Sequence, residues 1–310
     1  YSAGGLLFGD LYHVPSHHTP QGDGATGAVL RRGYLTFDAD FSSRWLARLR
    51  FEANQSGEFE TYDFEVEVKD LFLAWKPGRH QVTAGLSPTL TFDVIESIWG
   101  LRYLIRTPLD LQGVPSRDTG VSARGPLNEN GTFGYRAMIG AGAEFGNETG
   151  DGYKYMGALG WTPDDKWTVD LYLAYEKLSG PTDRKTFQLF VARESDHSRW
   201  GAQYSNQDRE EDPPLELASV FYVQGLGKKS SLIGRIDRLF EPSPKGDNIT
   251  YLPFDPTATA TMFLVGWEYR ISDIFRLTPN TVITAYDRND EGEVPKTDIH
   301  LRLTMFLDLE

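Results

Sequence analysis

The sequence predicts an all-β protein, a transmembrane antiparallel β-barrel, and three observations lead to this class. Apolar and polar residues alternate along many segments, which is the period of a β-strand. Short reverse turns alternate along the chain with longer and more polar connections. Six of the seven tryptophans flank the short turns, namely Trp45, Trp75, Trp161, Trp167, Trp200 and Trp267. Because indole rings favour the membrane–water interface, we expect these six to form a girdle at the periplasmic rim of the barrel, with Trp99 inside it.

The segment after Ser43 shows the alternation most simply. One face carries Trp45, Ala47, Leu49 and Phe51, and the other carries Arg48, Arg50 and Glu52. The apolar face is expected to contact lipid and the charged face a water-filled lumen. The same pattern gives sixteen segments, at 5–13, 26–41, 44–55, 63–76, 79–87, 117–126, 132–145, 153–161, 166–177, 184–195, 198–206, 215–226, 230–240, 257–271, 274–287 and 297–309. We therefore expect residues 1–310 to form a single barrel domain.

One segment breaks the phase of its alternation. Val66 and Val68 have the opposite parity to Leu71 and Leu73, which predicts a β-bulge near Lys69 and Asp70.

The lengths of the connections support the same topology. Connections after even-numbered segments are short, such as 42–43 and 77–78, whereas those after odd-numbered segments are mostly longer, such as 207–214 and 242–256. In outer-membrane barrels the short turns are periplasmic and the long loops extracellular. Both termini are then expected at the end of the barrel that carries the short turns.

Composition limits the function classes that fit. The net charge of −13 gives no basic surface for nucleic acid, and the absence of cysteine leaves no disulfide or thiolate metal site. No apolar run approaches the roughly 18 residues of a membrane-spanning helix. No export signal is visible in residues 1–4, so we expect an already processed chain.

The longest connection, from Pro88 to Ser116, is unusually apolar. We expect it to fold into the lumen and narrow the pore, because exposing that surface to water would cost several kcal/mol. The alternative is a loop that packs on the surface or binds a partner.

Charged residues near this loop predict a pore constriction. Arg32, Arg48 and Arg50 are expected to project inward from the second and third segments, and the loop carries Asp93, Glu96, Arg102, Arg106 and Asp110. A basic wall opposite an acidic loop would create a transverse field in the narrow passage. The alternative is a set of salt bridges that brace the barrel.

Three stretches carry a resemblance to a known family: 68–76 (VKDLFLAWK), 84–88 (AGLSP) and 116–121 (SRDTGV). They resemble the phosphate-selective porin O/P family, over about residues 26–145 of this chain. The resemblance implies a sixteen-stranded, often trimeric diffusion channel of the outer membrane. Two features depart from the family, because this chain is acidic overall and ends on Leu309 and Glu310 where an aromatic residue is usual.

Enzyme and metal chemistry are not favoured by the sequence. His13, His17 and His18 on the first long connection are interpreted as a solvated loop, and His300 has no serine or aspartate at a spacing that fixes a hydrolase site. Residues 287–292 with Asp298 loosely match a calcium loop but are interpreted as an acidic hairpin. The acidic tip at 208–212 is either solvated or bound to divalent ions that bridge lipopolysaccharide. We expect no cofactor.

Together these patterns predict a porin, a passive channel for small hydrophilic solutes or ions with weak selectivity. The expected partners are outer-membrane lipid and lipopolysaccharide, possible copies of the same chain in a homotrimer, and no nucleic acid. An alternative is a barrel scaffold that anchors or sheathes a cytochrome or a surface assembly and conducts little. Replacing Arg48 and Arg50 by Ala is expected to shift ion selectivity toward cations.

Overall fold

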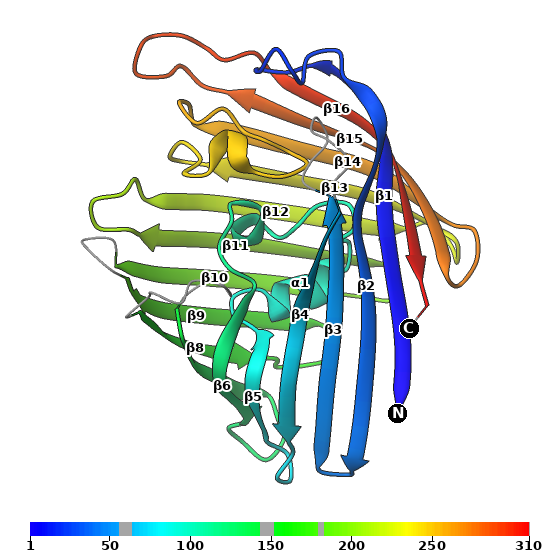
Figure 1. Cartoon of the computed structure of the whole chain (residues 1–310), viewed down its shortest axis with the longest axis vertical. Helices are drawn as coiled ribbons and strands as arrows, with labels where there is room; N and C mark the ends of the chain where they lie inside the picture. The colour runs from blue at the N-terminus through cyan, green and yellow to red at the C-terminus, as the bar shows by residue number, and fades with distance from the viewer. Residues whose placement is uncertain (56–63, 143–151, 179–182, 310) are drawn as a thin grey trace.

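The computed structural model describes residues 1–55, 64–142, 152–178 and 183–309. In this part of the chain sixteen antiparallel strands form a closed barrel, in which each strand pairs with its sequence neighbours and β1 pairs with β16 (Figure 1). Closure leaves no sheet edge without a hydrogen-bonding partner. The predicted fold class is confirmed.

The strand bounds agree with the sequence pattern to within a few residues. The strands are β1 (Ser2–Ser16), β2 (Thr26–Ser42), β3 (Trp45–Gln55), β4 (Phe64–Trp75), β5 (Gln81–Pro88), β6 (Arg117–Pro126), β7 (Phe133–Gly140), β8 (Tyr153–Trp161), β9 (Trp167–Lys177), β10 (Arg184–Glu194), β11 (Ser198–Asp208), β12 (Leu215–Gly225), β13 (Ser230–Leu239), β14 (Ala260–Arg270), β15 (Phe275–Tyr286) and β16 (Asp298–Asp308). The predicted segment 132–145 ends earlier, at Gly140, and its residues 143–145 lie outside the described residues.

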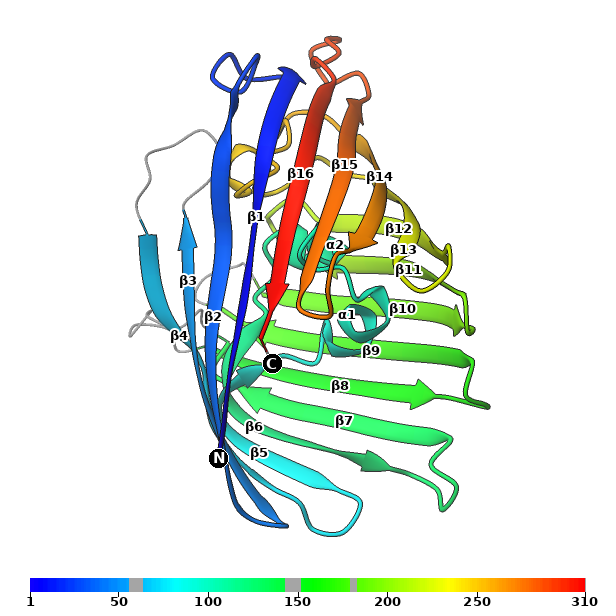
Figure 2. The ribbon, with the colours of Figure 1, turned by 90° about the vertical axis from the view of Figure 1, so that its right-hand side faces the viewer.

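The two ends of the barrel differ, as the connection lengths predict. β1 begins and β16 ends at the short-turn end, where the two termini lie (Figure 2). The long connections, including those after β1 and β13, lie at the opposite, long-loop end. Among the described residues, no helix has the length and apolar character needed to cross a membrane.

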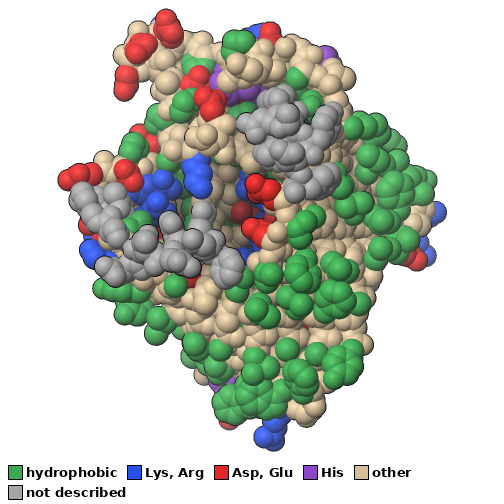
Figure 3. All heavy atoms as spheres, viewed as in Figure 1, with side chains coloured by type: hydrophobic (Ala, Val, Ile, Leu, Met, Phe, Trp, Pro, Cys, Tyr) green, Lys and Arg blue, Asp and Glu red, His purple; other side chains and the backbone are tan. Residues whose placement is uncertain are grey.

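Apolar side chains cover the outer wall. Figure 3 shows hydrophobic side chains gathered over the outside of β1–β4, whereas charged side chains gather in a hollow beside the long loops. Leu35 and Phe37 of β2 and Leu71 and Leu73 of β4 are exposed on this wall. This surface is what the alternation predicts for strands that contact lipid on one face.

Residues 88–116 fold into the barrel and form two short helices, α1 (Asp93–Trp99) and α2 (Pro108–Leu111) (Figure 1). The segment packs in one apolar cluster against the inner faces of β10 and β12–β15. The loop contributes Ile95, Ile98, Trp99, Leu101, Tyr103, Leu104, Ile105 and Leu111. The strands contribute, among others, Phe190, Phe221, Val223, Ile233, Met262, Leu264 and Val282. Insertion of this loop is therefore confirmed. The inner face on this side is therefore covered by the inserted loop, and buried apolar side chains lie there beside buried polar ones such as Ser219 and Asp237.

A second connection joins the same cluster. After β13 the chain forms a single 3₁₀ turn, η1 (Gly246–Asn248), and Ile249, Leu252 and Phe254 pack with the inserted loop. The phenolic hydroxyl of Tyr251 donates to the backbone carbonyls of Arg31 and Gln55, both at 2.7 Å. The segment 240–257 therefore spans the interior from β13 to β2.

Two β-bulges lie on the charged side of the barrel. The pairing of β3 with β4 shifts between Arg50 and Phe51, which oppose Asp70 and Val68, so the bulge predicted at Lys69 and Asp70 is confirmed. A bulge in β2 was not predicted. There Phe8 pairs with Arg32 while Asp10 pairs with Val29, so Arg31 and Arg32 both reach the interior.

Candidate channel constriction

A cavity of about 320 Å³ lies between the inserted loop and the charged wall of the barrel. Its charged lining consists of Arg32 from β2, Lys69 from β4, Arg117 from β6, Arg106 from the inserted loop, Lys245 from the segment 240–257, and the acids Glu67 and Asp110. Five cations thus face two carboxylates in a chain whose overall charge is −13. We call this space the cationic cavity.

The two β-bulges decide what the wall contributes to the cationic cavity. A bulge places two successive residues opposite one, so both can point to the same side of the sheet. In β2, Arg31 forms an ion pair with Asp10 and donates to it through Nη2 at 3.1 Å, while Arg32 lines the cavity. In β4, Lys69 lines the cavity while the neighbouring Asp70 bonds to Arg117.

Ion pairs partly neutralise the wall cations. Glu52 lies 3.4 Å from Arg32 and 3.2 Å from Lys69, and it is almost completely buried. Arg106 differs from Arg32 and Lys69 in its partners. Within the described ranges its guanidinium has hydrogen bonds to the carbonyl and hydroxyl of Thr250, at 3.3 and 3.2 Å, and no ion pair within 4 Å. Burial lowers the pKa of Arg106 to about 10, so this side chain is still a cation at neutral pH.

The inserted loop is held by arginines from three strands. Arg31 donates to the carbonyls of Tyr103 and Leu104, the latter at 3.0 Å. Arg199 of β11 donates to the carbonyl of Trp99 at 3.0 Å, and Arg235 of β13 donates to the carbonyl of Arg106 at 2.7 Å. Loop carbonyls outside regular structure need donors when buried, and these three side chains supply them.

The predicted constriction residues do not all meet at one place. Arg32, Arg106 and Asp110 line the cationic cavity, and Arg102 bonds to Glu96 at 2.9 Å and to Asp110 within the loop. Arg48 forms two bonds of 2.8 Å with Asp38, and Arg50 donates to Thr36 at 2.9 Å and lies 3.6 Å from Asp70. Arg48 and Arg50 therefore bond to the neighbouring strands β2 and β4.

The loop acids have partners of their own. Asp93 lies 3.3 Å from Arg136 of β7, and not beside the arginines of β2 and β3 that were expected to face it. Burial raises the pKa of both Asp93 and Glu96, whereas Arg102 and Arg106 lower the pKa of Asp110. The simple picture of an acidic loop facing a basic wall is thus replaced by a loop with mixed charge beside a cationic cavity.

Sequence reasoning missed several of these side chains. Lys69, Arg117 and Lys245 line the cationic cavity, and Arg199 and Arg235 anchor the inserted loop. A signal for the β2 bulge is present in the sequence: Ala28 and Leu30 are apolar at even positions, whereas Leu35 and Phe37 are apolar at odd ones. No local pattern marks Lys245, which reaches the cavity from a distant loop.

The six girdle tryptophans lie at or close to the strand ends beside short turns. Trp45 and Trp75 pair across β3 and β4 with ring centroids 6.2 Å apart, and Trp167 and Trp200 are 5.7 Å apart. Trp161 and Trp267 are exposed, at 43% and 47%. Trp99 is 1% exposed and lies in the inserted loop.

The interpretation of the histidines as a solvated loop is wrong for two of the three. His13 is exposed and bonds to the hydroxyl of Thr26 at 2.8 Å. His17 is 1% exposed, and His18 bonds to Asp298 and Asp247 at 2.8 Å each. The first long connection turns inward here and packs against the start of β16, which residue type alone does not reveal.

No protein family model and no curated protein sequence matches this chain. Solved structures do match. The chain is similar to the anion-selective porin from Comamonas acidovorans, with a TM-score of 0.71, 12% identity and 99% of each chain covered. It is similar to Salmonella typhi OmpF in complex with daunomycin, with a TM-score of 0.71, 10% identity, and 99% of this chain and 97% of that chain covered.

A third similar structure is the outer-membrane protein OmpT of Vibrio cholerae, with a TM-score of 0.65, 13% identity, and 99% of this chain and 97% of that chain covered. Identities this low establish a shared fold. The chain therefore has the sixteen-stranded barrel fold of bacterial outer-membrane porins.

Proposed function

We propose that this protein is a passive channel of a bacterial outer membrane, through which small hydrophilic solutes diffuse with weak selectivity that favours anions at the narrow part. The cationic cavity carries this proposal. One side of the lumen is filled by apolar packing, so solutes would pass along the charged side. Five cations and two carboxylates line the cavity there, and Glu52 and Asp70 behind them offset part of the positive charge. The similarity to a porin described as anion-selective supports the same direction.

Selectivity should be weak because the two signs of charge act at different places. Acidic side chains are numerous in the chain as a whole, and those on the long loops attract cations to the entrance by long-range steering. Cations in the cationic cavity act over a few ångströms in a space where screening is weaker than in bulk water. The two effects oppose each other.

A planar bilayer recording tests the proposal. Purified full-length protein should give stable open channels, and the reversal potential in a potassium chloride gradient should show a modest preference for chloride. Raising the salt concentration should change the selectivity, because it screens the entrance charges more strongly than the cationic cavity. A clear preference for potassium at all salt concentrations would contradict the assignment of the cationic cavity to the solute path.

The rival proposal is a scaffold that sheathes or anchors a partner and conducts little. That version uses the apolar loop 88–116 as a docking surface, yet its large side chains are buried against the inner wall. This packing supports the channel. Well-folded protein that gives no conductance would favour the scaffold instead.

Lipid, lipopolysaccharide and copies of the same chain are the proposed partners. One similar structure, of Vibrio cholerae OmpT, is described as a trimer form. Light scattering in mild detergent tests whether this chain assembles in the same way. The closer relationship to the phosphate-selective porin O/P family stays a prediction.

A further inference from the structure

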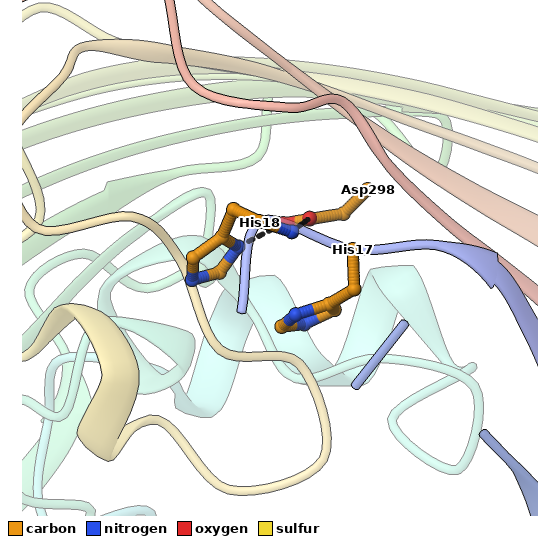
Figure 4. A group of neighbouring side chains, drawn as sticks. All are labelled: His17, His18 and Asp298. Atoms are coloured by element: carbon orange, nitrogen blue, oxygen red, sulfur yellow. Dashed lines mark hydrogen bonds and ion pairs between the residues drawn. The ribbon is translucent and has the colours of Figure 1, made fainter. Parts of the chain in front are cut away.

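A buried cluster of histidine and aspartate side chains lies at the long-loop end of the barrel (Figure 4). His17 and His18 directly follow β1, and Asp298 begins β16. One possible ligand atom from each of the three lies within 4.8 Å of the other two. We propose that these three side chains bind a divalent transition-metal ion of the zinc, copper, nickel or cobalt class, a role separate from the channel.

The donor set selects this class of ion. Two imidazole nitrogens and one carboxylate oxygen suit borderline divalent metals, whereas calcium and magnesium prefer oxygen ligands throughout. Metal–ligand bonds of about 2.0–2.2 Å place tetrahedral ligands roughly 3.3–3.6 Å apart. The ligand atoms in this cluster lie within 4.8 Å of one another, and the two imidazole rings are stacked with centroids 4.3 Å apart. Binding would therefore require the two rings to rotate out of this stack, so that one nitrogen of each points at the same ion.

Each proposed ligand also has an outer hydrogen bond that orients it, as metal ligands in proteins usually do. His18 Nε2 donates to Asp247 at 2.8 Å, which leaves Nδ1 directed at Asp298. Asp298 accepts the His18 backbone N–H through Oδ1 at 2.6 Å and the Tyr286 hydroxyl through Oδ2. His17 Nδ1 lies 2.9 Å from the hydroxyl of Thr19.

The proton balance of binding follows from these contacts. The two ring nitrogens of His18 each lie 2.8 Å from a carboxylate oxygen, of Asp298 and Asp247. When Nδ1 carries a proton, an ion at Nδ1 would replace it, and the proton goes to solvent. His17 Nδ1 accepts the Thr19 backbone N–H at 3.0 Å, so the proton of the neutral ring is on Nε2. Coordination through Nε2 would move that proton to Nδ1, where the Thr19 hydroxyl can accept it, and the Thr19 backbone N–H would then lose its bond to the ring.

An ion at this site would join three parts of the chain. His17 and His18 belong to the connection after β1, Asp298 belongs to β16, and Asp247 belongs to η1 in the segment 240–257. That segment also supplies Lys245 to the cationic cavity. The bound ion would therefore stabilise the arrangement of the loops above the passage.

Metal titration of the untagged, full-length protein in detergent tests the site, after a chelator has removed adventitious ions. Cobalt(II) should bind in one equivalent and give visible d–d absorption, and zinc(II) should displace it. The chain has no cysteine, so this absorption reports nitrogen and oxygen ligands. His17→Gln and His18→Gln should each abolish stoichiometric binding, and Asp247→Asn should weaken it about 10- to 100-fold.

Two control variants keep the test specific. His13→Gln changes an exposed histidine near the end of β1, and His80→Gln changes one beside a short turn at the other end of the barrel; both should leave the affinity unchanged. Circular dichroism checks that each variant keeps its barrel. The proposal is overturned if the folded wild-type protein binds no cobalt or zinc, or if binding survives both His17→Gln and His18→Gln. In either case the cluster only holds the loops together by hydrogen bonds. This outcome is independent of the bilayer recordings, which test the channel.

Discussion

How strongly an arginine in the lumen attracts a passing anion depends on whether a nearby carboxylate already neutralises its charge. Arg48 is held by both oxygens of Asp38, whereas Arg106 bonds to neutral groups of Thr250. Lys245 enters the cationic cavity across Gly113, where a Cβ would lie 2.4 Å from the lysine Cδ and the backbone has a φ of +80°. A passing anion should therefore interact more strongly with Arg106 than with Arg48.

Replacing Arg106 and Lys245 together by Gln should shift the reversal potential toward cations. The ratio of anion to cation permeability should fall about fivefold, which corresponds to roughly 1 kcal/mol of lost attraction at an intermediate effective dielectric. Replacing Lys166 and Lys228 by Gln removes the same charge from the short-turn end and is the matched control. Equal shifts in the two double variants would show that net charge, and not position, sets selectivity.

The paired arginines give a second, weaker expectation. Replacing Arg48 and Arg50 by Ala should move selectivity in the same direction but by less than the change at Arg106 and Lys245, because Asp38 and Asp70 already offset these two charges.

At the scale of elements, apolar packing holds the inserted loop while charged residues face the passage. Trp99 donates through its indole N–H to the carbonyl of Ile105 at 3.0 Å, packs edge-on against Phe221 at 5.0 Å, and lies under the guanidinium of Arg235 at 5.3 Å. The strands are joined by their own ladders, so loss of this anchor should affect the loop more than the barrel.

Trp99→Ala should loosen the inserted loop without opening the barrel. Truncating a buried aromatic side chain costs about 3–5 kcal/mol, and most of that loss should appear as weaker docking of the loop. Single-channel currents should become larger and noisier, while circular dichroism still reports a folded barrel. Trp267→Ala, on the outer surface, is the control and should leave the current unchanged. Unaltered currents in Trp99→Ala would mean that the loop does not border the solute path.

The acids of α1 predict a dependence of selectivity on pH. Burial raises the pKa of Asp93 and Glu96, so these two groups take up protons at a higher pH than ordinary carboxylates do. Their partners Arg136 and Arg102 remain charged. Acidification from neutral to mildly acidic pH should therefore make the loop more positive and increase the preference for anions.

Reversal potentials recorded over this pH range measure the effect. The variant Glu96→Gln should show a smaller change than the wild-type protein, because one of the two titrating groups has been removed. A shift toward cations on acidification would contradict the raised pKa values.

At the scale of the whole molecule, the two rims of the barrel have different surfaces. The girdle tryptophans lie beside short turns, while long acidic connections occupy the other end. Such an arrangement suits a barrel with a fixed orientation in its membrane.

Quenching by brominated lipid tests the placement of the tryptophans. Bromine near the headgroups should quench most of the emission, because six of the seven indoles are expected at that depth and Trp99 is shielded inside the barrel. Trp99→Phe should remove the fraction that lipid cannot quench, and Trp267→Phe should not. Strongest quenching by bromine at the bilayer centre would contradict the predicted girdle.

The sequence alone was enough for the barrel because its signals are local. Period-two alternation along Trp45 to Gln55, the turn at Ser42 and Ser43, and the phase change at Lys69 each depend on neighbours in sequence. The apolar composition of residues 88–116 likewise predicts that this loop is buried, whatever surface it packs against.

The tertiary structure decided which groups share a space. The apolar inner faces of β12–β14 seat the inserted loop, Lys245 reaches the cationic cavity from a distant connection, and His17 meets Asp298 across the closure of the barrel. Alternation reports which face a residue lies on, but it carries no information about what packs against that face from far along the chain. Charge compensation, and hence the candidate constriction, depends on those distant contacts.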